Sequence, residues 1–231
     1  MPEVPPVIKI VFPVKSILDT SRLQFILFVT KRTLRYLVSF VNFCNSRYNH
    51  VMKNLSKELI LETAAQLVQE KKKINLSLSE VGETLGVSHA ALYKYFPNKK
   101  ALWSELSLRW LNQQLTELFP FRPKSEQSVK EIAHDWLWLL ASKKYAASKA
   151  DPQMFALYTT YVGGDVQLYQ EHSYALGESF MAATGKDEDF TEGILLAFMY
   201  FSAPAYAQRW DERFQEEFEM VWRVVERSFE G

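Results

Sequence analysis

Residues 77–102 read SLSEVGETLGVSHAALYKYFPNKKAL and hold the clearest local signals in the chain. Ser77 and Glu80 have the spacing of a capping box, in which each side chain satisfies a free backbone amide at a helix start. A short helix is therefore predicted from about Leu78. Gly86 should end it, because glycine readily takes the left-handed conformation that follows a helix. Two short helices that meet at such a bend form a helix-turn-helix.

The second helix of this pair is expected over residues 89–96, with Ser88 as its N-cap. A helix of this kind lies in a DNA major groove and presents its first turn to base edges. Ala90 is small enough to let the backbone come close, whereas Leu92 and Phe96 should point into the core. The predicted base-reading residues are His89, Ala90 and Tyr93, although Tyr93 is alternatively structural and offers only its hydroxyl to phosphate.

A third helix should follow, because Pro97 ends the second helix and Asn98 can cap the next one. Its first turn carries Lys99 and Lys100, whose ammonium groups form a phosphate clamp together with the free amides. The apolar pattern continues to Leu118, so this helix should link two domains. The predicted phosphate contacts are Ser88, Lys94 and Lys99, and Ser77 is expected to add a backbone contact beside its cap.

At these positions the chain resembles the TetR family of bacterial transcriptional regulators. The matching motifs are Ser77, Val81-Gly82, Gly86-Val87-Ser88, Leu92-Tyr93-Lys94-Tyr95-Phe96 and Lys99-Lys100-Ala101-Leu102. Gly82 departs from the alanine that is usual in the family, but it keeps the small size that helix packing requires. The resemblance implies an all-α fold, in which a three-helix DNA-binding bundle is joined by a long helix to a C-terminal ligand-binding and dimerisation domain.

The rest of the chain from residue 56 also shows helical periodicity. Residues 56–70 carry one apolar stripe and fit the first helix of the bundle. Further helices are expected over residues 125–147, 152–163, 165–183, 188–208 and 211–229, and Pro204 should kink or end its helix. The first of these should bury Val129, Ile132, Trp136, Leu139 and Leu140. We predict an N-terminal extension over residues 1–51, a DNA-binding domain over 52–102 and a regulatory domain over 103–231.

The charge distribution and the cysteine content restrict the kind of partner and the cellular compartment that we expect for this chain. The formal net charge is zero, but basic residues are in excess up to residue 111 and acidic residues after it. This distribution fits a nucleic-acid module joined to a domain that stays off DNA, or else ordinary surface charge. The single cysteine, Cys44, excludes an internal disulfide and favours a reducing, cytoplasmic setting. No apolar run reaches the roughly 18 residues of a membrane span.

The first 51 residues differ from the rest in their early prolines, bulky apolar residues and scattered basic ones. Three interpretations compete: an arm that grips DNA, a signal or anchor segment, and a stretch translated from upstream of the true start. Residues 25–29 are too few, and too closely flanked by charge, for a good signal core. Met52 is followed by Lys-Asn-Leu-Ser-Lys, a natural opening for such a domain, so we favour the upstream-start interpretation.

The last two predicted helices carry large aromatic side chains on one face, which could bury more surface than one monomer covers. In TetR-like proteins the last two helices form a four-helix dimer interface, and the resemblance implies the same homodimer here. The alternative is that both stripes are ordinary core. The residues concerned are Phe190, Ile194, Phe198 and Phe201, followed by Phe214, Phe218, Val221, Trp222, Val225 and Phe229.

The resemblance also places a small-molecule pocket among the C-terminal helices. Aromatic and sulfur-containing side chains could line such a pocket, although they are more often plain core. The candidate lining residues are Trp136, Met154, Phe155, Tyr158, Tyr161, Tyr169, Met181 and Phe198. His134 and His172 are candidate polar contacts, with a satisfied interior or surface histidine as the alternative.

No enzymatic activity, cofactor or metal is expected. The pair His134-Asp135 occurs in metal-dependent phosphohydrolases, but those sites need further ligands that the remaining histidines do not supply. The leading hypothesis is a repressor that binds operator DNA as a dimer and is released by a small ligand. The alternative is a TetR-like helical protein that recruits a partner protein without reading DNA.

Overall fold

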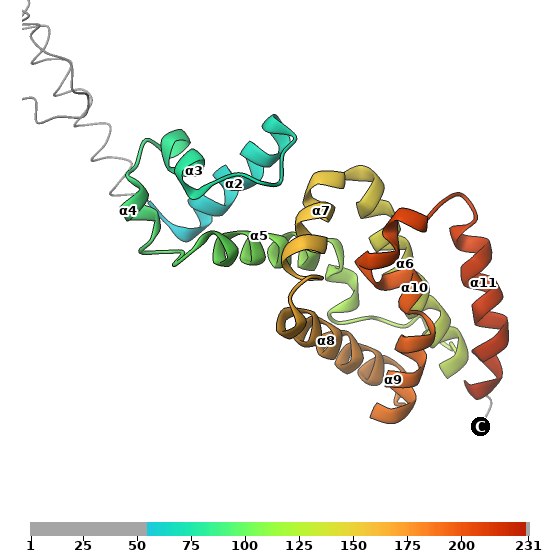
Figure 1. Cartoon of the computed structure of the whole chain (residues 1–231). Helices are drawn as coiled ribbons and strands as arrows, with labels where there is room; N and C mark the ends of the chain where they lie inside the picture. Colours follow the sequence, from blue (N-terminus) through green and yellow to red (C-terminus); the bar gives the residue numbers. More distant parts are fainter. Residues whose placement is uncertain (1–54, 230–231) are drawn as a thin grey trace, which may run out of the picture. The chain divides into compact units, whose positions relative to one another are not determined.

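The computed structural model describes residues 55–229, and over this range it contains helices and no strands (Figure 1). The predicted all-α class is therefore confirmed. The described helices belong to one compact unit that begins at Ser56. The predictions on residues 1–51, with Cys44, and on Met52 as the true start lie outside the described residues. Within the described range, no helix combines the length and the apolar character that crossing a bilayer requires.

The N-terminal bundle contains α2 (Lys57–Lys71), α3 (Leu78–Leu85) and α4 (His89–Leu92). The Ser77 hydroxyl accepts the backbone N–H of Glu80 at 3.2 Å, and the Glu80 carboxylate accepts the N–H of Ser77 at 2.8 Å. Gly86 ends α3 with a φ of +67°, in the left-handed region. The predicted capping box and glycine turn are thus confirmed, and they set the bend between α3 and α4.

Helix α4 is shorter than predicted, because it ends at Leu92 and not at Phe96. Residues 93–95 form turns, in which the Leu92 carbonyl accepts the N–H groups of Tyr95 at 2.9 Å and Phe96 at 3.0 Å. Pro97 disfavours the α conformation for Phe96, so the helix does not extend through that residue. The helix therefore consists of little more than its first turn.

Helix α5 (Lys99–Gln114) starts at the predicted Asn98 cap. The prediction that it continues to Leu118 is wrong in the last turn, where η1 (Thr116–Leu118) is a 3-10 helix. The Thr116 hydroxyl donates to the carbonyl groups of residues 112 and 113, which competes with the α-helical pattern. Helix α5 runs without a break past residue 102, so no change of structure marks a boundary at that position. The predicted division into domains there stays a prediction.

The C-terminal helices are α6 (Val129–Ala150), α7 (Pro152–Tyr161), α8 (Val166–Thr184), α9 (Glu188–Ala197), α10 (Met199–Ser202) and α11 (Phe214–Val225), with the 3-10 helices η2 (Pro204–Arg209) and η3 (Glu226–Phe229). Helix α7 packs against both α5 and α2, and α8 packs against α6 and α9. The N-terminal bundle and the C-terminal helices are therefore in direct contact through α7.

The bounds and the buried face of α6 differ from the prediction. The helix begins at Val129, later than residue 125, because Ser128 and Glu131 form a second capping box. Trp136 is fully buried as predicted, whereas Val129 is 38 % exposed and Leu139 is only half-buried. Val129 is the first residue of α6, and its side chain stays partly open to solvent.

The prediction of a single helix over residues 188–208 is wrong. It is divided into α9, α10 and η2, and Ala203 between α10 and η2 has an extended conformation. Proline has no N–H to donate and its ring clashes with the preceding helical turn, so Pro204 cannot continue α10. The prediction that Pro204 ends its helix is confirmed.

The aromatic stripe of α11 packs within the single chain. Phe214, Phe218 and Trp222 are buried, and the ring centre of Phe218 lies 5.0 Å from that of Phe198 and 5.5 Å from that of Phe201. This stripe is therefore monomer core, so the expectation that it exceeds what one monomer covers is wrong. The large apolar side chains that stay exposed on α9 and α11 are Leu196, Met220 and Val224.

Candidate nucleic-acid interface and ligand pocket

Helix α4 and the turn after it expose a group of side chains that we call the recognition surface. The recognition surface consists of Ser88, His89, Ala90, Tyr93 and Lys94, all of which are exposed. Ala91 and Leu92 are buried and anchor α4 to the bundle. Tyr93 is 47 % exposed, and its ring lies edge-to-face with the His89 ring, with 4.6 Å between the two ring centres. The predicted base-reading residues are thus accessible from one side.

Ser77 lies at the edge of this region, half-buried, and its hydroxyl is engaged in the α3 cap. It accepts the N–H of Glu80 and donates to the Glu80 carboxylate at 3.0 Å. The backbone N–H of Ser77 is the largest cause that lowers the pKa of Glu80 to about 2, and the Lys71 ammonium adds to it. Glu80 is therefore a carboxylate throughout the physiological range, and Ser77 has a structural role in the free protein.

The two lysines at the start of α5 have different partners. The Lys99 ammonium donates to the side-chain carbonyl of Asn75, a neutral partner, and no carboxylate within residues 55–229 forms an ion pair with it. Lys100 forms an ion pair with Asp165, the N-cap residue of α8. Lys100 would have to leave Asp165 to bind phosphate, so the predicted phosphate clamp of both lysines stays a prediction.

Two side-chain contacts join the N-terminal bundle to the N-terminal ends of α8 and α7. Lys100 on α5 pairs with Asp165 at the start of α8. On α2, the Gln69 side-chain amide donates to the Asp151 carboxylate at 2.7 Å, and Asp151 caps α7. A shift of α7 or α8 would therefore displace residues of the bundle directly.

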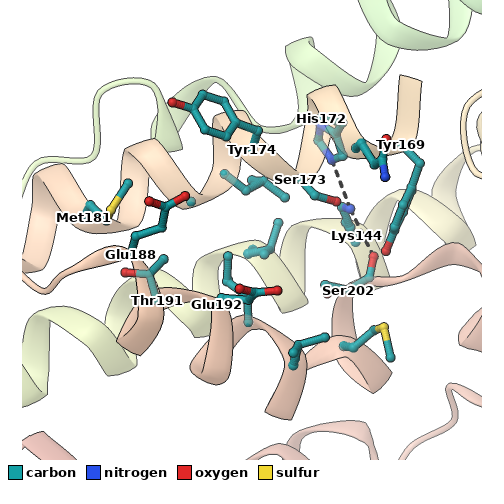
Figure 2. A pocket seen from close by; sticks show the side chains of 17 residues that line it. Lys144, Tyr169, His172, Ser173, Tyr174, Met181, Glu188, Thr191, Glu192 and Ser202 are labelled. Carbon is teal, nitrogen blue, oxygen red and sulfur yellow. Dashed lines mark hydrogen bonds between the residues drawn. The ribbon is translucent and has the colours of Figure 1, made fainter. Parts of the chain in front are cut away.

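A pocket of about 510 Å³ lies among α6, α8, α9 and α10. Of the predicted lining residues, Tyr169 and Met181 line it, and so does the predicted polar contact His172 (Figure 2). The other predicted residues lie elsewhere: Trp136, Met154, Phe155, Tyr158 and Phe198 are buried core residues, and Tyr161 is half-buried at the end of α7. The pocket thus opens beside the aromatic core and not within it.

The most unusual group in the pocket wall is Lys144 of α6, which sequence reasoning missed. Its side chain is fully buried, and its ammonium Nζ lies 3.0 Å from Tyr158 Oη, 3.0 Å from the Ser202 carbonyl oxygen and 3.3 Å from His172 Nε2. Burial lowers the pKa of Lys144 to about 7 and that of His172 to about 3. A lysine in an amphipathic helix normally lies on the solvent side, so no local signal distinguishes this one.

His134 lies outside this pocket and contacts carboxylates. Its Nε2 is 3.1 Å from Glu219, and its Nδ1 is 3.6 Å from the neighbouring Asp135. No group of three or more potential metal ligands occurs within residues 55–229. The half-buried His134 ring also packs against the rings of Phe218 and Trp222, so this histidine contacts both carboxylates and aromatic side chains.

Comparison with known families agrees with this geometry. Residues 60–106 match the family model of the bacterial regulatory proteins of the tetR family, and this segment runs from α2 into α5. The predicted resemblance is thereby confirmed, and the chain carries the N-terminal helix-turn-helix of a TetR-family DNA-binding transcriptional regulator. No curated protein matches the chain in a sequence search.

Proposed function

We propose that the protein is a cytoplasmic repressor that binds its operator as a homodimer and is released when a small ligand fills the pocket. The observation that carries this proposal is the series of contacts that connects α4 to the pocket. The recognition surface on α4 adjoins α5, and the first turn of α5 holds α8, a wall of the pocket, through the Lys100–Asp165 ion pair. DNA binding by α4 and ligand binding in the pocket would therefore affect helices that contact one another.

In the proposed complex, α4 lies in the major groove. His89, Ala90 and Tyr93 would meet base edges, while Ser88, Lys94 and Lys99 would bind phosphates on either side. Ser77 is a weaker candidate, because its hydroxyl is already engaged in the α3 cap. Since α4 has a single turn, only its exposed residues and Tyr93, directly after it, would reach into the groove.

A near-palindromic operator requires two copies of the recognition surface at a set spacing. We place the dimer interface on α9 and α11, as in TetR-like proteins. Leu196 on α9 is 57 % exposed and Val224 on α11 is 80 % exposed, which supports an apolar contact there. Met220 lies on the same exposed side of the chain's last α-helix.

Ligand binding would weaken DNA binding by moving α8 and α7. Asp165 would carry a shift of α8 to Lys100, and Asp151 would carry a shift of α7 to Gln69. A ligand that binds better to the arrangement in which the two recognition surfaces are wrongly spaced shifts the protein to that arrangement.

Fluorescence anisotropy with the DNA upstream of the protein's own gene tests this proposal. We expect Lys94→Ala to weaken binding and to lower the slope of log affinity against log salt by about 0.9 for each phosphate that the variant no longer binds. Arg122→Ala is the matched control, because it removes an exposed positive charge from the loop before α6. Equal effects of both changes, or an affinity that salt does not alter, would contradict DNA reading by α4.

The alternative, recruitment of a partner protein without DNA reading, is separated by the double variant Tyr93→Ala, Lys99→Ala. Loss of DNA binding with an unchanged dimer mass in light scattering supports the repressor. Unchanged regulation in cells by this variant would support the alternative.

A further inference from the structure

We propose that the pocket binds a monocarboxylate with an apolar body, whose carboxylate lies against Lys144 and whose body lies between α8 and α9. This inference rests on the proposed function, because it names the chemical class of the ligand that would release DNA. It is carried by a buried cation without a counter-ion, by an apolar wall, by the charge at the far end and by an unpaired hydroxyl.

Among residues 55–229, no negative charge lies against the Lys144 ammonium group. The three groups around Nζ are the Tyr158 hydroxyl, the Ser202 carbonyl and His172 Nε2, and all of them are neutral acceptors. No carboxylate within residues 55–229 forms an ion pair with Lys144. Burying an ammonium group without a counter-ion is unfavourable, so a ligand carboxylate would supply the missing partner.

The carboxylate would enter from the pocket side, where His172 lies. The contact between Lys144 Nζ and His172 Nε2 is 3.3 Å, the longest of the three, so it is the contact that a carboxylate oxygen would replace. Lys144, His172, Ser202 and Tyr169 gather at one end of the pocket (Figure 2). His172 stays neutral above about pH 3 and adds no competing positive charge.

The middle of the pocket suits a hydrocarbon chain. Its walls are largely apolar, and its volume of about 510 Å³ lies in the range of small-molecule sites. The apolar lining residues from four helices are Leu140, Leu176, Met181, Leu195, Leu196 and Met199. A ligand made only of polar groups would leave these side chains without matching contacts.

The far end of the pocket disfavours a second negative charge. Glu188 and Glu192 are exposed lining residues of α9, and Glu188 lies near Met181, away from Lys144 (Figure 2). Thr191, between them, is a buried lining residue whose hydroxyl has no hydrogen-bond partner within residues 55–229. A buried polar group normally has a partner, so at this end a neutral ligand oxygen, such as a hydroxyl, is favoured over a second carboxylate.

Calorimetric titration of the purified full-length protein with four probes of equal carbon-chain length tests the proposed class of ligand. We expect decanoate to bind at least tenfold more tightly than decan-1-ol, decylammonium and decanedioate. Equal or tighter binding of the alcohol or of the ammonium compound overturns the proposal. Equal binding of the diacid overturns the predicted restriction to a single negative charge.

The pH dependence provides a test that needs no variant. Above about pH 7 decanoate binding would require uptake of a proton by Lys144, so its affinity should fall by up to tenfold per pH unit, and that of decan-1-ol should not. The groups facing Lys144 are Tyr158 from α7, His172 and Tyr169 from α8 and the Ser202 carbonyl from α10, with Glu188 and Glu192 across the pocket on α9. A decanoate affinity that is constant from pH 7 to pH 9 would overturn the role of Lys144.

Lys144→Met should reduce decanoate affinity at least tenfold and leave decan-1-ol binding unchanged. Lys143→Met is the matched control, since Lys143 is the neighbouring lysine on α6 and pairs with Glu117 outside the pocket. Circular dichroism verifies folding, and the wild-type probe and pH series decide the question if Lys144→Met does not fold. Equal reductions in both variants would contradict a specific contact.

DNA binding is measured separately on the same preparation, so that the two proposals can fail independently. Decanoate preference without DNA binding supports the ligand class and contradicts the repressor. DNA binding together with equal affinities for decanoate and decan-1-ol supports the repressor and overturns the ligand class.

Discussion

The Lys100–Asp165 ion pair makes a prediction about DNA binding that can be isolated by one substitution. Asp165 has two tasks: one carboxylate oxygen accepts the N–H of Leu168 at 3.1 Å and caps α8, and the other pairs with Lys100. Hydrogen bonding from Lys100 is the largest cause that lowers the pKa of Asp165, so the pair is ionised at neutral pH. Asp165→Asn keeps the cap, because Asn and Asp are equally good N-cap residues, and removes the charge.

Without its partner, Lys100 becomes a free cation beside Lys99 in the first turn of α5. Its side chain is already 64 % exposed, so it needs no repacking to turn towards DNA. One additional phosphate contact steepens the slope of log affinity against log salt by about 0.9, which is about 1.8 for a dimer with two such units. We therefore expect Asp165→Asn to bind DNA more tightly at low salt and to lose this advantage at high salt.

Fluorescence anisotropy at salt concentrations between about 50 and 200 mM measures this slope. Asp151→Asn is the matched control: it makes the same charge change at the N-cap of α7, where the partner is the neutral Gln69 and not a lysine. If Asp165→Asn and Asp151→Asn have the wild-type slope, Lys100 does not reach phosphate and the reasoning is refuted.

Three further predictions concern stability. Thr191→Val should raise the free energy of unfolding by about 1 kcal/mol in urea titration, because it removes a buried, unpaired hydroxyl at constant volume; a decrease in stability would show that this hydroxyl has a partner. Gly86→Ala should lower the free energy of unfolding by about 1–2 kcal/mol through the φ of +67° alone, because nothing lies within 4 Å of an added Cβ. Gly193→Ala in α9 is the control and should raise the free energy of unfolding by up to about 1 kcal/mol. Similar effects of the two substitutions would contradict the left-handed turn at Gly86. Because the pKa of Lys144 is lowered from 10.5 to about 7, the unfolded chain binds a proton that the native state releases between these values. Stability should therefore rise with pH from 7 to 10, by at most about 1.4 kcal/mol per pH unit, and Lys144→Met should lack this rise in melts across that range.

The local design of the DNA-binding bundle could be predicted from the residues alone. Ser77 with Glu80, Gly86, and the caps Ser88 and Asn98 act on groups within about four positions along the chain. Such interactions need no knowledge of the rest of the fold. The end of α4 was misplaced because the apolar periodicity continues to Phe96, whereas the helix ends at Leu92 and residues 93–95 form turns.

The site in the C-terminal helices could not be predicted in the same way. Lys144 and His172 are 28 residues apart along the chain, and Lys144 and Ser202 are 58 apart. Aromatic composition pointed to Trp136 and Phe155, but these fill the core, where closely packed rings leave no space. A pocket forms where packing is incomplete, and the order of residues in a chain does not show where that will be.

Helix starts, the glycine bend and the outward residues of the recognition surface therefore follow from the sequence, because each depends on neighbours only one helical turn away. The burial of Lys144, the pairing of Lys100 with Asp165 and the enclosure of the α11 aromatic stripe follow only from the way the helices pack. Packing brings together groups that are distant in the chain, and it alone settles which charges are shielded from water and which find a partner.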